Sequence, residues 1–427
     1  MDFEFSLVGG KISGPSGILT LMDDLGRALA SDPDMLMLGG GNPALVPEMV
    51  SLWRERIDVL LATGTMDKLL GQYDPPQGNL QVLASLAKLL KSRFGWNVRI
   101  ENIAATSGGQ TAFFYLFNLL AGKMKNGQHR KILLPLTPEY IGYAPLGLSE
   151  EHFVGCRPLI STPDPTQPHI FKYHLDLPAV EQTMQRHAIG ALAISRPTNP
   201  SGNFLSDEET QQLVELAAAH HVPVIIDNAY GAPFPGVVFR DTVPVWNESI
   251  ITTFSLSKLG LPGTRTAFVV AAPEIIRAIT AMSAVTGLSH GTLGQQMVAG
   301  LIESGEILDL GPQILRPFYE KRSQFAVESL TAKLRQHGVN GKIHMSEGAF
   351  FLWLWLPDLP IPASELYERL KRRKVLVVPG EPFFFGLEEP WDHARQCLRL
   401  NFAQPANVLE RAFEIIASEV AAIMKGA

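Results

Sequence analysis

Short, uninterrupted apolar runs recur along the middle of the chain and are separated by stretches with helical spacing of apolar residues. Five runs have the length and composition of strands: "KILLPL" (131–136), "ALAIS" (191–195), "VPVIID" (222–227), "IITTFS" (250–255) and "AFVVAA" (267–272). A strand that is apolar on both sides is buried on both faces of its sheet. The alternation with helices therefore predicts an α/β domain with a mostly parallel sheet between helices.

Helical patterns flank these strands, and a second α/β pattern follows them. Residues 47–62 begin with Pro and are followed by Gly64, and residues 79–94 stop at Gly95, as helices commonly do. The chain is helical in pattern between about 280 and 325. The later part predicts a smaller α/β domain, with strands at 349–356, 375–380 and 397–402, a helix at 363–372 and a long C-terminal helix.

Composition narrows the class of protein. The 427 residues, at roughly 150 per domain, suggest about two or three domains. A net charge of −6 argues against binding to nucleic acid, because no basic block would hold phosphates. The longest strongly apolar run (350–356) is too short to cross a membrane, and "MDFEFSLVGG" does not resemble a signal peptide. The two cysteines, Cys156 and Cys397, have no metal-ligand spacing. We expect a cytoplasmic, enzyme-sized protein without membrane partners or metal.

Four polar or aromatic residues follow directly after predicted strands. They are Tyr140, Asn199, Asp227 and Lys258. Ligands of open α/β sheets bind outside the carboxyl ends of the strands, so these side chains are expected to face one crevice. Each has a simpler interpretation: the aspartate as a helix cap, the asparagine as a turn residue, the lysine as a solvated charge.

A glycine-rich turn precedes an apolar helix in "ATSGGQTAFFYLFNLL" (105–120). Free backbone N–H groups at such a helix start can bind phosphate. The alternative is an ordinary loop with Thr106 or Ser107 as the helix cap. The turn is neither a Walker A loop nor a GxGxxG motif, so it carries little weight alone.

An amine nucleophile, a phosphate loop, a carboxylate at a strand end and an aromatic residue for stacking together suit pyridoxal 5′-phosphate (PLP). The lysine amine attacks the PLP aldehyde, and the acidic residue pairs with the pyridinium nitrogen. An adjacent carboxylate keeps that nitrogen protonated, because an opposite charge favours the charged form.

Four motifs resemble those of the class I/II (fold type I) aminotransferases. "SLSKLGLPGTR" is similar to their Schiff-base signature, "SRPTNPSGN" to their Asn-Pro-x-Gly turn, "IIDNAYG" to their Asp-x-x-Tyr and "CLRLNFA" to the segment with their substrate-carboxylate arginine. The resemblance covers nearly the whole chain. It implies a large PLP-binding domain (47–300) with a seven-stranded, mostly parallel sheet, a small C-terminal domain (301–427) and an N-terminal segment (1–46) that packs on the small domain.

The resemblance also implies a role for each matching residue. Lys258 is the Schiff-base lysine and the base that moves the α-proton, with its pKa lowered by desolvation and by Arg265. By the same resemblance, Asp227 pairs with the pyridinium nitrogen, Tyr230 and Asn199 donate to the phenolic oxygen of PLP, and Tyr140 stacks on its ring. The phosphate cradle is formed by Gly108, Gly109, Gln110, Ser255 and Arg265. Arg399, with Gly40 and Asn199 nearby, binds the substrate carboxylate, and Tyr73 reaches the phosphate of the neighbouring subunit.

The substrate class follows from finer likeness. "LGGGNPA", "YDPPQG", "FFYLFNLLAG", "PLTPEYIGYA" and "PFFFGLEEPW" resemble members that exchange the amino group of valine with pyruvate by a ping-pong mechanism. The partners implied are amino acids, 2-oxo acids and a second copy of the chain in a homodimer with shared sites. Alternatives are a transaminase for another small neutral amino acid or a C–S lyase. A non-catalytic PLP-binding regulator needs a DNA-binding module, for which we see no room before a pattern that begins within the first forty residues.

Two apolar stretches are candidates for the substrate side-chain pocket. They are "GILTLM" (17–22) and "PFFFG" (382–386), whose alternative interpretation is plain core. No further arginine lies in a motif that suggests a site for a second substrate carboxylate. A small apolar side chain is therefore expected.

Overall fold

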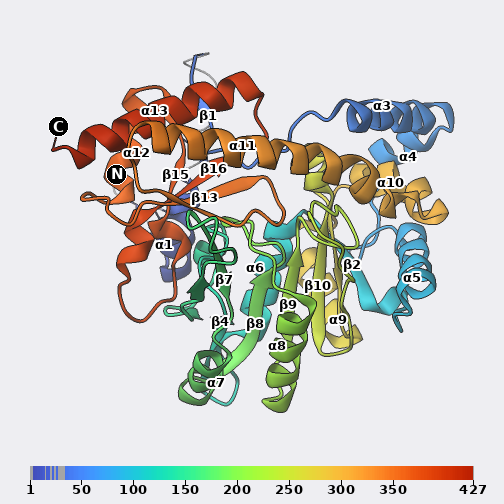
Figure 1. Cartoon of the computed structure of the whole chain (residues 1–427). Coiled ribbons are helices and arrows are strands. Elements are labelled where there is room, and N and C mark those ends of the chain that lie inside the picture. Colours follow the sequence, from blue (N-terminus) through green and yellow to red (C-terminus); the bar gives the residue numbers. More distant parts are fainter. Residues whose placement is uncertain (1–2, 15, 20–21, 24–25, 27–33, 427) are drawn as a thin grey trace.

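The computed structural model describes residues 3–14, 16–19, 22–23, 26 and 34–426 (Figure 1). Its helices are α1 (Leu7–Ser13), α3 (Pro47–Ala62), α4 (Thr65–Gly71), α5 (Leu80–Phe94), α6 (Gly109–Leu120), α7 (Leu177–Arg186), α8 (Asp207–Ala219), α9 (Pro273–Gly287), α10 (Leu293–Ser304), α11 (Arg316–Gln336), α12 (Ala363–Arg372) and α13 (Ala406–Met424).

Each predicted run contains or overlaps a strand, and further short strands occur where no run predicted one. The strands are β1 (Leu36–Met37), β2 (Ile103–Thr106), β3 (Gly122–Lys123), β4 (His129–Leu134), β5 (Phe153–Gly155), β6 (Leu159–Ser161), β7 (Ile170–His174), β8 (Ile189–Ser195), β9 (Val224–Asn228), β10 (Ile250–Ser255), β11 (Ala267–Val270), β12 (Lys342–His344), β13 (Phe351–Trp355), β14 (Val375–Leu376), β15 (Val378–Pro379) and β16 (Cys397–Asn401).

The larger sheet has the order β2-β11-β10-β9-β8-β4-β3, with β5 also paired to β4. Neighbours from β10 to β5 run parallel, and β11 is antiparallel to both of its neighbours. The mostly parallel sheet is therefore confirmed. Seven strands, β2, β11, β10, β9, β8, β4 and β5, form this sheet, and the two-residue strand β3 pairs antiparallel with β4 as an addition at its edge.

Helices cover both faces of this sheet, as the continuous apolar strands predict. In β8, Ala191 and Ala193 pack in one core with α6 and α9, whereas Leu192 and Ile194 pack in another with α7 and α8. Figure 1 shows α8 on the near side of the sheet and α6 partly hidden behind it. Successive side chains of a strand point to opposite faces, so both sets are buried and the strand carries no polar face.

Local signals account for the ends of the helices next to the sheet. Pro47 occupies the first turn of α3, where a missing N–H costs no hydrogen bond. The Asn79 side chain accepts from the Val82 N–H at the start of α5, and Gly95 ends that helix in a left-handed conformation. Both predicted helices are confirmed.

The second sheet joins segments that are far apart in sequence. Its order is β15-β16-β13-β12-β7-β6, and β7 runs parallel to β12 with Ile170 opposite Ile343. Thus β6 and β7 lie within residues 47–300 but complete the sheet of the C-terminal part. In the N-terminal segment, β1 pairs with β14. The domain boundaries at 46 and 300 stay predictions.

Helices α11 and α13 cover this C-terminal layer and run alongside each other across the top of Figure 1. Among the described residues, no helix combines the length and the apolar character that crossing a bilayer requires.

We expect Gly190→Ala to destabilise the larger sheet. A methyl group at this position in β8 would overlap the backbone carbonyl of Leu120 at the end of α6. Overpacking against a fixed backbone costs about 1–3 kcal/mol, to be measured by urea unfolding. Gly71→Ala is the control, because nothing lies within 4 Å of its added methyl group. Equal stability of the two variants would contradict the packing described here.

Candidate active site

Lys258 lies in a 3-10 turn, Leu256–Leu259, directly after β10. Its half-buried amine donates to the Gly41 carbonyl at 2.7 Å and lies 5.3 Å from the ring centres of Tyr230 and Phe350. Burial, followed by the positive charges of Arg399 and Arg265, lowers the pKa of Lys258 to about 7. Much of this amine is therefore a neutral nucleophile at neutral pH. The predicted lowering of the pKa is confirmed, with Arg399 a stronger cause than Arg265.

Asp227 lies near the end of β9 and is buried. Its Oδ1 accepts from the Ala229 N–H at 2.8 Å and the Thr253 hydroxyl at 3.1 Å, and its Oδ2 accepts from the Tyr143 hydroxyl. Burial raises the pKa of Asp227, while these hydrogen bonds and Lys258 oppose the rise. A buried carboxylate held in this way is a fixed partner for a cationic ring nitrogen.

Tyr143 and Thr253 are functional contacts that the motifs did not identify. Tyr143 follows the predicted stacking residue Tyr140 by three positions, and the two rings meet edge to face at 5.3 Å. The available signal was this spacing in "PEYIGYA", which places a second tyrosine in the same turn.

The start of α6 forms a cradle with Arg265. Gly108 has a φ of +87°, and a Cβ there would overlap the Arg265 guanidinium. Nothing lies within 4 Å of a Cβ at Gly109, so the space before the helix is open. The first N–H groups of a helix have no partner within it, and together with an arginine they suit a phosphate.

Two predicted members of the cradle have side chains engaged elsewhere. Gln110 uses one N–H of its side-chain amide to donate to the Gly142 carbonyl at 2.8 Å, which turns the side chain toward that turn. The Ser255 hydroxyl accepts from the Ser257 N–H at 3.2 Å and so shapes the turn that carries Lys258. Their roles toward phosphate stay predictions.

Arg399, in β16, is only 2% exposed. Its guanidinium donates to Asn199 Oδ1 at 2.9 Å and to the Gly39 carbonyl at 2.7 Å. It lies over the rings of Phe351 and Phe383, at 4.3 and 5.4 Å from their centres. Burial lowers its pKa to about 10, so it keeps its charge at neutral pH. Within the described residues its Nε has no hydrogen-bond partner, which suits it to bind a carboxylate.

A run of three glycines connects the two cations. The carbonyls of Gly39 and Gly41 accept from Arg399 and Lys258, and the Gly40 carbonyl accepts from Asn401 Nδ2 at 2.6 Å. Of the three glycines only Gly40 was predicted to lie near the substrate, because carbonyl directions cannot be deduced from sequence.

The remaining predicted residues divide into two groups. Tyr230 is buried with its ring beside Lys258, and Asn199 turns its amide oxygen to Arg399, which leaves its amide nitrogen to donate. Tyr73, in contrast, is 86% exposed and lines a surface hollow with Leu70 and His290. It does not join the group around Lys258 within this chain.

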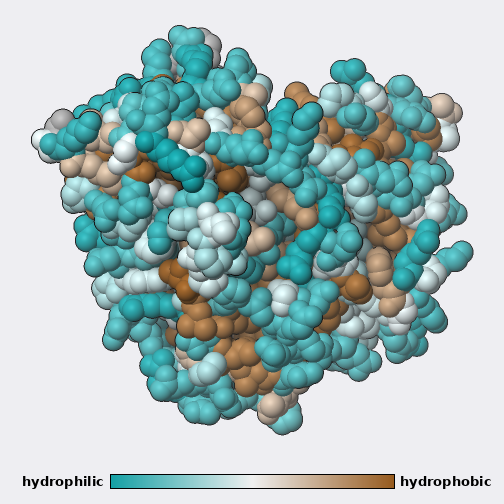
Figure 2. Space-filling view, in the orientation of Figure 1, coloured by the Kyte–Doolittle hydropathy of each residue, from teal (hydrophilic) through white to brown (hydrophobic). Residues whose placement is uncertain are grey.

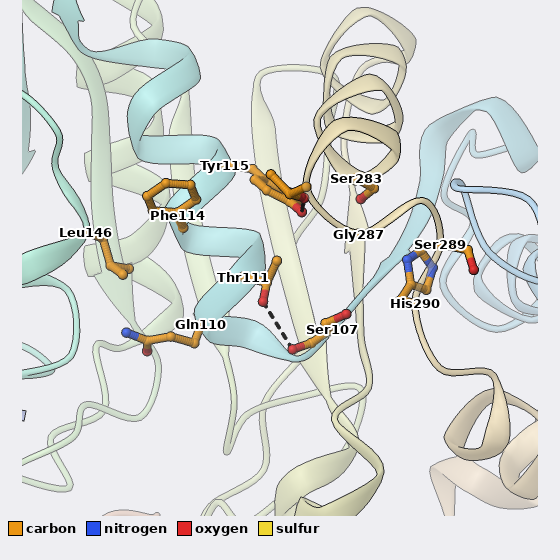
Figure 3. A pocket seen from close by; sticks show the side chains of 11 residues that line it. Ser107, Gln110, Thr111, Phe114, Tyr115, Leu146, Ser283, Gly287, Ser289 and His290 are labelled. Carbon is orange, nitrogen blue, oxygen red and sulfur yellow. Dashed lines mark hydrogen bonds between the residues drawn. The ribbon is translucent and has the colours of Figure 1, made fainter. Parts of the chain in front are cut away.

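Figure 3 shows a neighbouring hollow beside the phosphate loop. One wall is the start of α6, with Ser107, Gln110 and Thr111, and the opposite wall comes from residues 283–290 at the end of α9. The buried imidazole of His290 lines both hollows, and burial lowers its pKa.

These residues fit PLP. The structure contains an amine with a lowered pKa, a buried carboxylate that could pair with the ring nitrogen, and an arginine beside a helix start whose glycine admits no side chain.

Comparison with known proteins agrees with this chemistry. Residues 161–416 match the family model described as aminotransferase class I and II. The chain belongs to this aminotransferase family. Family membership brings with it the cofactor PLP, which the site fits, and the enzyme is a transferase of amino groups.

Two solved structures and one curated protein are particularly similar to this aminotransferase. Valine–pyruvate aminotransferase of Escherichia coli (strain K12) is 44% identical, over 97% of this chain and 98% of its own. A putative amino-acid aminotransferase of Psychrobacter arcticum 273-4 superposes with a TM-score of 0.95 at 40% identity, over the whole of both chains. Valine-pyruvate aminotransferase of Salmonella typhimurium LT2 has a TM-score of 0.84 at 41% identity, over 96% of this chain and 100% of its own.

We expect Tyr143→Phe to shift the acid limb of the aminotransferase pH profile to higher pH. The lost hydrogen bond lowers the pKa of Asp227, so its removal raises that pKa and leaves less carboxylate at a given pH. A hydrogen bond to a charged group contributes about 1.5–3 kcal/mol, so kcat/KM should fall on the order of tenfold or more.

Tyr173→Phe is the matched control for this measurement. Tyr173 is also buried, but its hydroxyl contacts Trp353 and His393 in the second sheet. We expect this variant to lose stability without a shift of the pH profile. An unshifted profile in Tyr143→Phe would contradict the role given to its hydroxyl.

Proposed function

We propose that this aminotransferase transfers the amino group between valine and pyruvate, giving 2-oxoisovalerate and alanine in a ping-pong order. One observation carries the choice of substrate. The charges that act on Lys258 in this chain are those of Arg399, Arg265 and Asp227. If Arg265 binds the phosphate and Arg399 binds the substrate α-carboxylate, neither of these two described cations is left for a second substrate carboxylate. The 44% identity to the valine–pyruvate enzyme of E. coli supports the same choice.

Lys258 acts as nucleophile and as base. When bound, PLP supplies an aldehyde for the amine and a ring that can accept the electron pair left on the substrate α-carbon. Lys258 Nζ removes the proton from that carbon and returns a proton in the reverse half-reaction. Its lowered pKa suits both tasks, because a base with a pKa near the working pH is efficient in each direction.

Asp227 holds a proton on the ring nitrogen by presenting a fixed negative charge to it. Its three hydrogen bonds prevent the carboxylate from rotating away. Tyr230 and the amide nitrogen of Asn199 would donate hydrogen bonds to the phenolic oxygen of bound PLP. These fixed donors and acceptors need no rearrangement during the reaction.

Arg399 orients the substrate, and aromatic rings surround it. Bidentate binding of the α-carboxylate to a guanidinium is geometrically strict. Phe351 and Phe383 flank this guanidinium. Because Phe383 belongs to "PFFFG", this stretch would lie beside the bound substrate. In the other candidate stretch, "GILTLM", Gly17 lies close to Ile141 and Pro382. Residues 20–21 of that stretch lie outside the described residues.

We also propose a homodimer with shared active sites. Large apolar residues are exposed in the segments that line the two surface hollows: Leu70, Tyr73, Val285 and Leu288. Figure 2 also shows hydrophobic atoms at the surface near the corner formed by α3, α4 and α10. Clustered exposed apolar residues mark interaction surfaces. A second copy seated there would bring its own Tyr73 toward the open phosphate loop.

We propose a cytoplasmic location for this enzyme. Cys156 and Cys397 are both free and buried, which suits a reducing compartment.

We expect Lys258→Ala to abolish transamination and the covalent fixation of PLP by borohydride. In the wild type, uptake of PLP by the apo-protein should rise as the pH rises through about 7, because the neutral amine is the nucleophile. An ordinary lysine would give a midpoint of about 10.4. Lys342→Ala is the control, since Lys342 is also half-buried over an aromatic ring, that of Trp355. Mass spectrometry that finds the label on another lysine would refute the assignment.

We expect modest discrimination among valine, alanine and 2-aminobutyrate, and strong rejection of aspartate. One methylene in an apolar pocket changes binding by about 1–3 kcal/mol. The second carboxylate of aspartate would be buried without a partner, which costs much more. Measured kcat/KM values for aspartate equal to those for valine would refute the substrate assignment and leave the aminotransferase family intact.

We expect a mixture of Tyr73→Ala and Lys258→Ala chains to regain activity. Each heterodimer would contain one site with both an intact lysine and an intact tyrosine from the neighbouring chain. Subunit exchange is followed by native mass spectrometry. Leu61→Ala, at an exposed apolar side chain on α3, replaces Tyr73→Ala in the control mixture. Exchange without recovery would place Tyr73 outside the shared site.

A further inference from the structure

Glu139 is a buried carboxyl group that the proposed mechanism does not use. It is only 1% exposed and immediately precedes Tyr140, the predicted stacking residue. Buried glutamates are rare unless they are paired or hydrogen-bonded. Glu139 makes no salt bridge with any described residue, so its role is sought in its hydrogen bonds.

Three donors converge on this carboxyl group. Its Oε1 accepts from the Ser195 N–H at 2.8 Å, and its Oε2 accepts from the Tyr140 N–H at 3.1 Å and from the Ser195 hydroxyl. Ser195 is the last residue of β8 and lies beside Asp227 in the sheet. One side chain therefore connects the turn after β4 to the end of β8.

The same turn contacts three other parts of the site. The Tyr143 hydroxyl donates to Asp227, and the Gly142 carbonyl accepts from Gln110 at the start of α6. The Glu139 N–H donates to the Phe383 carbonyl at 2.9 Å, beside Arg399. Beyond Ser195, the chain enters the turn that carries Asn199.

We propose that Glu139 is a positioning residue, whose carboxyl group holds the turn of Tyr140 and Tyr143 against the end of β8 and thereby sets the distance between the stacking ring and the groups that bind PLP. This inference rests on the proposed function, since Tyr140 stacks on a ring only if PLP binds here.

The protonation of Glu139 is compatible with this role. Burial raises its pKa to about 8, opposed by the hydrogen bonds from Ser195 and Tyr140. At neutral pH the group is therefore mainly uncharged, and its own O–H then donates to the Ser195 hydroxyl oxygen while the two backbone N–H groups still donate to the carboxyl. It can hold the turn without placing a second negative charge beside Asp227, which would compete for the proton on the ring nitrogen.

The test compares PLP binding by the variants Glu139→Ala and Glu139→Gln with the wild type. The alanine leaves the N–H groups of Ser195 and Tyr140 without an acceptor, so the dissociation constant for PLP should rise on the order of tenfold. The visible circular dichroism of the bound PLP should also change, because it reports how the ring is held. Glutamine retains one acceptor oxygen, so its values should lie between those of the wild type and the alanine variant.

Thr137→Val is the matched control. Thr137 lies in the same turn and is fully buried, but its hydroxyl donates to the Cys156 carbonyl on the side away from β8. We expect this variant to lower the unfolding temperature and to leave PLP binding and circular dichroism unchanged.

The outcomes separate this inference from the proposed function. A wild type that binds no PLP would overturn both. A wild type that binds PLP, with Glu139→Ala behaving like Thr137→Val, would overturn the positioning role alone. If the alanine variant does not fold, the glutamine variant decides: a raised dissociation constant with altered circular dichroism supports the role, and wild-type values overturn it.

Discussion

The amine of Lys258 lies under aromatic rings and close to two arginines, and this placement makes it a nucleophile rather than a solvated cation. An ordinary lysine is almost fully protonated at neutral pH. The burial that lowers the pKa of Lys258 also requires the other charged groups of the site to have hydrogen-bond partners. Asp227 needs three donors because burial disfavours its charge, and Arg399 needs two acceptors for the same reason. Each hydrogen bond of the site compensates for removal of a charged group from water.

Much of this site could be predicted from the ends of strands. Asp227 and Lys258 follow continuous apolar runs, and parallel strands bring their carboxyl ends to one edge. Gly108, directly before α6, was an equally useful signal for the phosphate cradle, because its positive φ and the approach of Arg265 both exclude a side chain there. These features depend on local chain geometry, which a sequence pattern reports well.

Other features depend on contacts between distant segments, and the sequence did not reveal them. The pairing of β7 with β12 joins two runs that no local pattern connects. The bond from Tyr143 to Asp227 and the turning of Gln110 toward Gly142 each require the fold to be complete. The short strand β3 escaped prediction because two residues are too few to show a period. Long-range register and side-chain direction were thus the missing information.

The parallel pairing of β7 with β12 has a consequence for how the chain is made. During translation β7 leaves the ribosome long before β12 has been synthesised, so Ile170 can pair with Ile343 only much later. Until then β7 presents an open strand edge on which another nascent chain could pair. Formation of non-local parallel pairs is also slow, because a long loop must close first. Correct biogenesis of this enzyme should accordingly depend on how well the cell shields that edge during translation.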